Sequence, residues 1–155
     1  MFSRVLIDSC VLLDAYFTFR DGHQQARKLL LHLAETDAVC CMPSHAYFEQ
    51  AVAAIVHFKR EPGVLEQNPI DQTTIPDLKL QIVALDNEYA NRLLQTLHGA
   101  AIPDLKSPDL IYFCIARDQD LTLVTEDRRL RNVARKGGLR AFHVEEALAI
   151  LQMNA

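Results

Sequence analysis

Short apolar runs alternate along this chain with longer segments in which apolar residues recur every three or four positions. A short continuous run, partly β-branched, is typical of a buried strand, whereas the wider spacing indicates an amphipathic helix. The runs predict strands at 4–7, 38–42, 79–85, 121–125 and 140–144. The wider spacing predicts helices at 10–17, 23–35, 46–58, 88–97, 107–116, 127–136 and 145–152.

Capping residues mark several of these boundaries. Asp86 is placed to cap the helix that follows it, and Pro43 suits the first turn of the next predicted helix. Ser107 followed by Pro108 predicts a helix start, with Ser107 as the cap. Residues 59–76 are polar, proline-rich and without a period, so we expect an excursion over the surface.

The alternation of strands and helices predicts an α/β fold with a mostly parallel sheet and helices on both faces. A length of 155 residues is consistent with a single domain over residues 1–155. In such sheets a functional site lies beyond the carboxyl ends of the strands. Asp8 and Asp127 each follow a predicted strand and therefore fall at that edge.

Composition narrows the class of protein. Half of the residues are hydrophobic and the net charge is -4, so we expect a globular protein without a global field that attracts nucleic acid. The four cysteines lie in apolar segments without a Cys-x-x-Cys pair, which favours reduced, buried thiols. With neither a signal peptide nor a membrane-spanning run, the sequence predicts a cytoplasmic protein.

Four acids are candidates for a shared site: Asp8, Glu49, Asp109 and Asp127. Converging carboxylates repel one another, so a divalent cation such as Mg²⁺ or Mn²⁺ would be needed to hold them together. Each aspartate alone is also explained as a turn or helix-start residue. Glu49 is harder to explain structurally, because its apolar neighbours in the chain predict that it is buried.

In a metal-dependent scheme for phosphodiester hydrolysis, Asp8 and Asp109 are the direct ligands. Glu49 and Asp127 hold metal-bound waters or a second ion. The hydroxyls of Ser9 and Thr125 could hydrogen-bond the metal ligands or the scissile phosphate without contacting the metal themselves.

Four segments, in order and approximate spacing, resemble the motif blocks of PIN domains. The Thr-x-Asp block after a strand is the most specific, followed by the first Asp-Ser pair. The segments are Val5–Ser9, Pro43–Glu49, Ser107–Tyr112 and Val124–Leu130.

Within that family, the compact VapC-like toxins of toxin–antitoxin pairs are the most similar subgroup. The resemblance implies a three-layer α/β/α, Rossmann-like fold and an endoribonuclease that depends on Mg²⁺ or Mn²⁺, with the four acids as its catalytic set. It also implies an RNA substrate, a small antitoxin partner and a homodimer. Cys10 departs from the pattern, since relatives often carry a small polar residue or asparagine there.

Other residues leave alternatives open. Arg128, Arg131 and Arg135 share one helix face, which either binds RNA phosphates or is an ordinary solvated face. His45 precedes Glu49 by one helical turn and could line the site, although a satisfied or solvated histidine is the favoured interpretation.

Two rival classes remain: a catalytically inactive PIN-like module that binds RNA or protein, and a phospho-receiver domain. The receiver is disfavoured because its middle strand should end in an aspartate, whereas this one ends in Cys41-Met42-Pro43.

Overall fold

The computed structural model describes residues 2–36, 38–60, 75, 77–97 and 103–153. Its centre is a five-stranded sheet in the order β3-β2-β1-β4-β5. All four neighbouring pairs are parallel, which confirms the predicted sheet. The strands are β1 (Arg4–Ile7), β2 (Val39–Pro43), β3 (Lys79–Val83), β4 (Thr122–Val124) and β5 (Ala141–Phe142).

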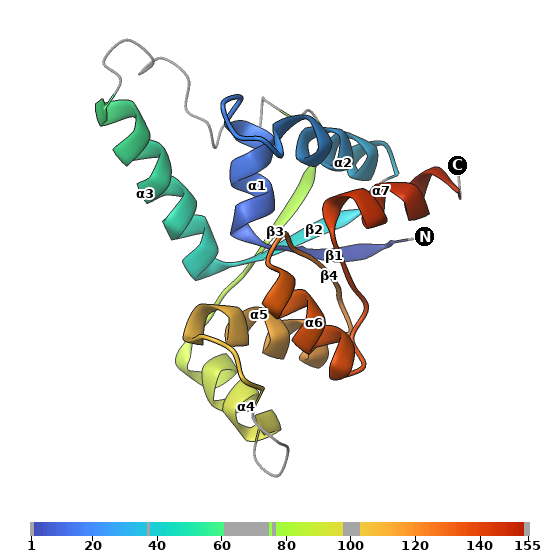
Figure 1. Cartoon of the computed structure of the whole chain (residues 1–155). Coiled ribbons are helices and arrows are strands. Elements are labelled where there is room, and N and C mark those ends of the chain that lie inside the picture. Colours follow the sequence, from blue (N-terminus) through green and yellow to red (C-terminus); the bar gives the residue numbers. More distant parts are fainter. Residues whose placement is uncertain (1, 37, 61–74, 76, 98–102, 154–155) are drawn as a thin grey trace.

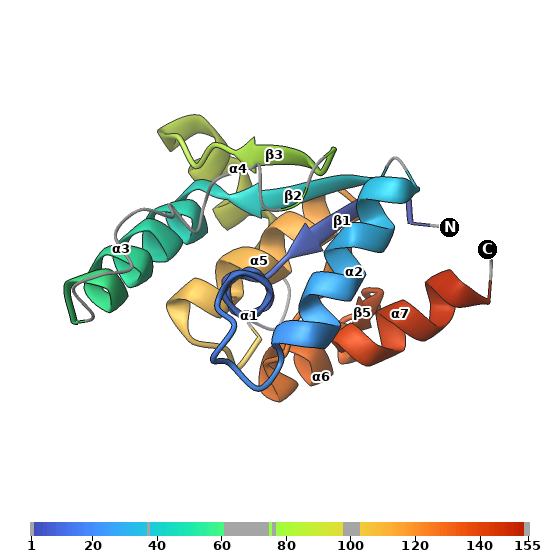
Figure 2. The same ribbon diagram turned by 90° about the horizontal axis from the view of Figure 1, so that it is seen from above.

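Helices cover both faces of the sheet and form the outer layers of a three-layer α/β/α fold (Figures 1 and 2). One layer holds α1 (Ser9–Tyr16), α2 (His23–Glu35) and α7 (Val144–Gln152), with α3 (Ser44–Arg60) beside α1. The other holds α4 (Asn87–Leu97), α5 (Ser107–Asp118) and α6 (Arg128–Lys136). None of the described helices is both long and apolar enough to cross a bilayer.

The position of each strand in the sheet explains its hydrophobic pattern. β1 is central, and Val5, Leu6 and Ile7 are fully buried between the two helical layers. β3 lies at an edge, where Gln81 and Ile82 are exposed while Val83 is buried. In the sequence, the central parallel strand is therefore a continuous apolar run, whereas polar residues interrupt the run of the edge strand.

Every element boundary lies within two residues of its predicted position, but two boundary residues were assigned the wrong role. Pro43 ends β2, in register with Val83, instead of entering the next helix, and α3 begins at Ser44 and continues to Arg60. Pairing of β2 with β1 ends at Cys41, so Pro43 has a partner strand on one side only, where the missing N–H of proline is tolerated as it is on an edge strand. Ser107 is the first residue of α5 and Lys106 is its N-cap. The surface excursion predicted for 59–76 falls largely outside the described residues.

Candidate functional site

The carboxyl ends of β1 and β4 meet at one edge of the sheet, because the two strands are adjacent and parallel. Asp8 follows β1 and is the N-cap residue of α1, and its backbone N–H donates to the Val124 carbonyl at 3.0 Å. Thr125 follows β4, and Asp127 is the N-cap of α6. The fold thus places Asp8 directly against Thr125, at the sheet edge where the sequence predicted Asp8 and Asp127.

Hydroxyl groups hold the Asp8 carboxylate in place. Thr125 Oγ1 donates to Asp8 Oδ2 at 2.5 Å and accepts the Asp127 backbone N–H at 2.9 Å. Ser9 Oγ lies 3.4 Å from Asp8 Oδ1. Asp8 is 7% exposed and Thr125 is fully buried, so this carboxylate depends on those donors in place of bulk water. The Thr-x-Asp motif therefore links two of the predicted acids through one side chain.

Asp109 lies in the first turn of α5, within electrostatic reach of two other acids. Burial raises the pKa of its carboxyl, and the charges of Asp127 and Asp8 raise it further, against the opposing charge of Lys106. Asp127 is exposed and also caps α6, with its Oδ1 2.8 Å from the backbone N of Leu130. The structure thus brings three of the four predicted acids together.

The position of Glu49 contradicts one prediction. It is exposed on α3, so the inference that it is buried was wrong. Its neighbours Phe48, Val52 and Val56 are 69%, 40% and 43% exposed. α3 meets the rest of the fold mainly near its start and then extends away from the sheet (Figure 1). Phe48 and Val52, which looked like core residues in the sequence, instead form an exposed stripe with Val56.

His45 lies on the first turn of α3, beside the acids. Its ring packs edge-on against Tyr112, with centroids 5.6 Å apart. Burial lowers its pKa, whereas the charges of Glu49 and Asp8 raise it. Both ring nitrogens are shielded from solvent and have no hydrogen-bond partner among the described residues. The favoured interpretation of a satisfied or solvated histidine was therefore wrong.

Sequence reasoning also assigned no separate role to Tyr112 or Cys10. The Tyr112 hydroxyl accepts the backbone N–H of Ser9 at 3.0 Å, and burial together with the charge of Asp8 raises its pKa. Burial likewise raises the pKa of the Cys10 thiol, with Asp8 adding to the effect. Tyr112 follows Asp109 by one helical turn, and this i, i+3 spacing was the available signal.

The arginines of α6 are used largely within the protein. Arg135 donates to the Ala141 carbonyl at 2.7 Å and pairs with Glu146 at 2.5 Å. Arg131 points to the Thr125 carbonyl at 3.4 Å. Arg129 pairs with Asp104 at 2.7 Å. Arg128 is exposed and makes no hydrogen bond or ion pair with the described part of the chain.

The donor set at the sheet edge fits a hard divalent cation. Carboxylate oxygens are the ligands that Mg²⁺ and Mn²⁺ prefer, and Mg²⁺ keeps several waters, so one or two carboxylates suffice. The mutual repulsion that raises the pKa of Asp109 would be relieved by such an ion. Within the described ranges, no three His, Cys, Asp or Glu side chains form a group that could hold a metal ion by themselves. An ion here would therefore need water as well as protein ligands.

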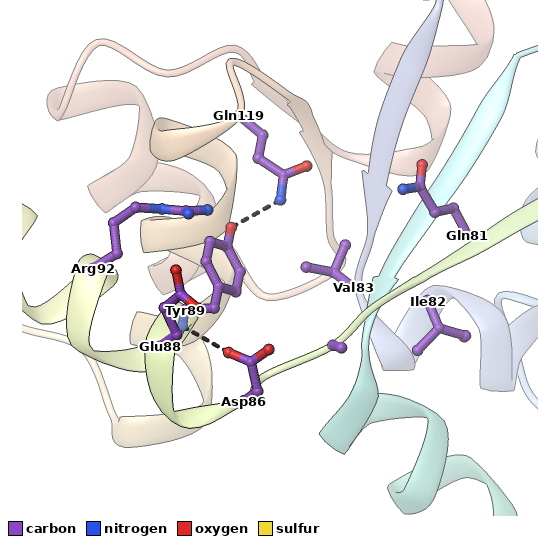
Figure 3. Close-up of a pocket in the computed structure, with 9 residues that line it drawn as sticks. Gln81, Ile82, Val83, Asp86, Glu88, Tyr89, Arg92 and Gln119 are labelled. Carbon is purple, nitrogen blue, oxygen red and sulfur yellow. Dashed lines mark hydrogen bonds between the residues drawn. The ribbon is translucent and has the colours of Figure 1, made fainter.

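A separate polar cleft of about 370 Å³ lies beside the edge strand β3 (Figure 3). Its groups already bind one another: Gln119 Nε2 donates to the Tyr89 hydroxyl at 2.8 Å, and Asp86 Oδ1 accepts the Tyr89 backbone N–H at 2.8 Å. The second contact confirms Asp86 as a helix cap. Because Tyr89 is already hydrogen-bonded to Gln119 and to Asp86, the cleft offers fewer free polar groups than the acidic edge.

The fold and the acidic edge define an α/β protein whose candidate site lies at the carboxyl ends of parallel strands. The sequence profile of the PIN domain matches residues 5–136. The chain belongs to the PIN domain family. Comparison with curated proteins gives no significant match.

Solved structures show the same fold at low sequence identity. PAE2754 from Pyrobaculum aerophilum is 17% identical with a TM-score of 0.61, over 99% of each chain. VapBC2 from Rickettsia felis, bound to a DNA fragment from its promoter, is 16% identical with a TM-score of 0.60, over 90% of this chain and 98% of that one. FitAB, bound to the IR36 DNA fragment, is 15% identical with a TM-score of 0.55, over 90% of this chain and 94% of that one.

Proposed function

We propose that the protein is an endoribonuclease that hydrolyses RNA phosphodiester bonds with Mg²⁺ or Mn²⁺. The observation that carries the proposal is the convergence of Asp8 and Asp127 at the sheet edge, where the Thr125 hydroxyl donates to Asp8 and accepts the Asp127 N–H, with Asp109 within electrostatic reach of both acids. A carboxylate of a PIN domain held within electrostatic reach of two others is suited to binding a cation with them, and membership of that family favours a nuclease.

Asp8 and Asp109 would hold the ion. When bound, it would supply a water of lowered pKa and neutralise charge on the phosphate. The hydroxyls of Thr125 and Ser9 fix the Asp8 carboxylate, so its oxygens need little reorganisation on binding. Asp127 would orient water at the edge of the site while capping α6.

The test is RNA cleavage with either metal by wild type and Asp8→Asn. The substitution keeps the shape of the side chain but removes its charge, so we expect a loss of activity of 100-fold or more, roughly the scale of losing one charge-stabilising group. Asp120→Asn is the matched control, because the Asp120 side chain is 96% exposed and its φ of 48° suits asparagine. Cleavage without metal, or full activity of Asp8→Asn, would contradict the proposal.

One observation favours the alternative, an inactive PIN-like module that binds RNA or protein. The described side chains do not form a closed group of three metal ligands. The same assay separates the two functions, because an inactive module would bind RNA without cleaving it in Mg²⁺ or Mn²⁺, and Asp8→Asn would change nothing.

We also propose that the nuclease is the toxin of a toxin–antitoxin pair. The fold is shared with VapBC2 and FitAB. The exposed α3 stripe, formed by Phe48, Val52 and Val56, offers apolar surface that a small antitoxin would cover. Expression of the chain alone should arrest growth, and co-expression of a small neighbouring gene should relieve the arrest.

Variants of the α3 stripe test that partner site. Phe48→Asp with Val52→Asp should abolish co-purification of the antitoxin while RNA cleavage persists, because both side chains are exposed. Leu31→Asp is the control, since Leu31 is 38% exposed on a different helix. Equal loss of co-purification in the α3 variant and in the Leu31→Asp control, or no small partner gene, would contradict the assignment. The proposed homodimer is checked by light scattering of the purified protein.

A further inference from the structure

Glu49 stands apart from the other three acids. The carboxylates that act most strongly on Asp109 are those of Asp127 and Asp8. Glu49 instead acts on His45, four residues earlier on the same helix. The charge of Asp8 acts on that same ring. His45 is therefore the residue through which Glu49 is linked to the acidic edge.

The ring of His45 is held but not hydrogen-bonded. Its contact with Tyr112 fixes the plane of the ring, and Tyr112 is in turn tied to the start of α1 by the Ser9 N–H. Neither ring nitrogen has a partner among the described residues. A shielded polar group without a partner is unfavourable, so such an arrangement persists where the group serves another purpose.

We infer that His45 is a positioning residue for Glu49: the exposed Glu49 carboxylate turns to accept a hydrogen bond from the His45 ring, a bond that is absent from the present structure, and is thereby drawn to the acidic edge. This inference rests on the proposed metal-dependent function, because it assigns Glu49 its place among the ligands.

The chemistry of the two side chains matches this role. A neutral imidazole carries one N–H donor, and residues at i and i+4 of a helix lie on the same face. The carboxylate of Glu49 is exposed and free to turn, whereas the ring is fixed by Tyr112. A histidine that holds a metal-ligating or water-holding carboxylate acts on metal affinity even though it never touches the metal.

A double-mutant cycle on Mn²⁺ affinity tests the inference, with calorimetry of the full chain in the absence of RNA. The variants are His45→Leu, Glu49→Gln and the two combined. We expect each single variant to weaken Mn²⁺ binding roughly tenfold. Because both changes remove one interaction, the combined variant should bind no more weakly than Glu49→Gln alone.

His45→Gln should recover part of the affinity, since its amide can still donate to Glu49. His32→Leu is the matched control, because His32 also has a buried ring nitrogen without a partner but lies on α2. It should leave Mn²⁺ affinity unchanged. Thermal unfolding of each variant identifies any that fail to fold.

Three results would overturn the inference: wild type binds no Mn²⁺, His45→Leu binds as wild type does, or the effects of the two substitutions multiply in the combined variant. Failure of the proposed function is distinguishable. Coupled Mn²⁺ binding without RNA cleavage would refute the nuclease and still support the role of His45.

Discussion

Thr125→Val should destabilise the protein although it changes only one atom of a buried side chain. The hydroxyl of Thr125 donates to Asp8 at 2.5 Å and accepts from the Asp127 N–H at 2.9 Å. Valine has the same shape and can replace neither bond. Asp8 then loses a donor in a position where only 7% of the residue is exposed.

The magnitude follows from these two bonds. A hydrogen bond to a charged group contributes about 1.5–3 kcal/mol, and one between neutral groups contributes about 0.5–1.5 kcal/mol. The added methyl group recovers about 0.8 kcal/mol by apolar burial. We therefore expect a net loss of about 2 kcal/mol in the free energy of unfolding.

Urea unfolding without added metal measures the loss directly. With a slope of about 2 kcal/mol per molar urea, the midpoint should fall by about 1 M while the slope stays unchanged. Thr122→Val is the control, because Thr122 is 1% exposed on β4, the strand that Thr125 follows, and its hydroxyl makes no described bond to Asp8 or Asp127. A midpoint shift equal to that of the control would refute the hydroxyl bridge.

Three further predictions follow from described contacts. Asp109→Asn should stabilise the metal-free protein. Because the pKa of the Asp109 carboxyl is raised in the folded protein, wild type loses stability as pH rises from the ordinary pKa, about 3.9, through the raised pKa. Thermal unfolding should therefore show the variant's gain in stability above that pH window and little gain below it. Gly137→Ala should cost about 1–3 kcal/mol in urea unfolding, because a Cβ there would lie 2.8 Å from the Phe113 ring. Arg128→Ala should weaken RNA binding and reduce by about 1 the slope of log binding constant against log salt concentration. Arg135→Ala breaks the bonds to Ala141 and Glu146, so it should chiefly lower the melting temperature.

The sequence predicted the sheet because β1 and β4 are buried on both faces, which leaves an unbroken apolar run in the chain. The boundaries at Pro43 and Ser107 were less predictable. Proline is accepted both in the first turn of a helix and at the last position of a strand. Only the register with Val83 decides between them, and that register depends on a partner strand about 40 residues away.

In the candidate site, too, some features depend on the local sequence and others on distant parts of the chain. Asp8 and Asp127 could be placed from sequence because parallel strands end at one edge, so local patterns determine where those acids lie. The direction of α3 is not local. Whether Phe48 is buried depends on which elements pack against α3 beyond its first turns, and the structure leaves it 69% exposed. An apolar helix face can thus be mistaken for core when it is a surface for a partner.

Electrostatics explains why His45 could not be identified from spacing alone. The i, i+4 relation to Glu49 is visible in the chain, but the contact with Tyr112 and the proximity of Asp8 arise only when α3 and α5 meet at the sheet edge. Burial lowers the pKa of the ring while two carboxylates raise it, and burial prevails. The ring is therefore biased toward its neutral form, and a neutral ring can orient Glu49 without offsetting the negative charge of the acids. That charge is left for a divalent cation to neutralise.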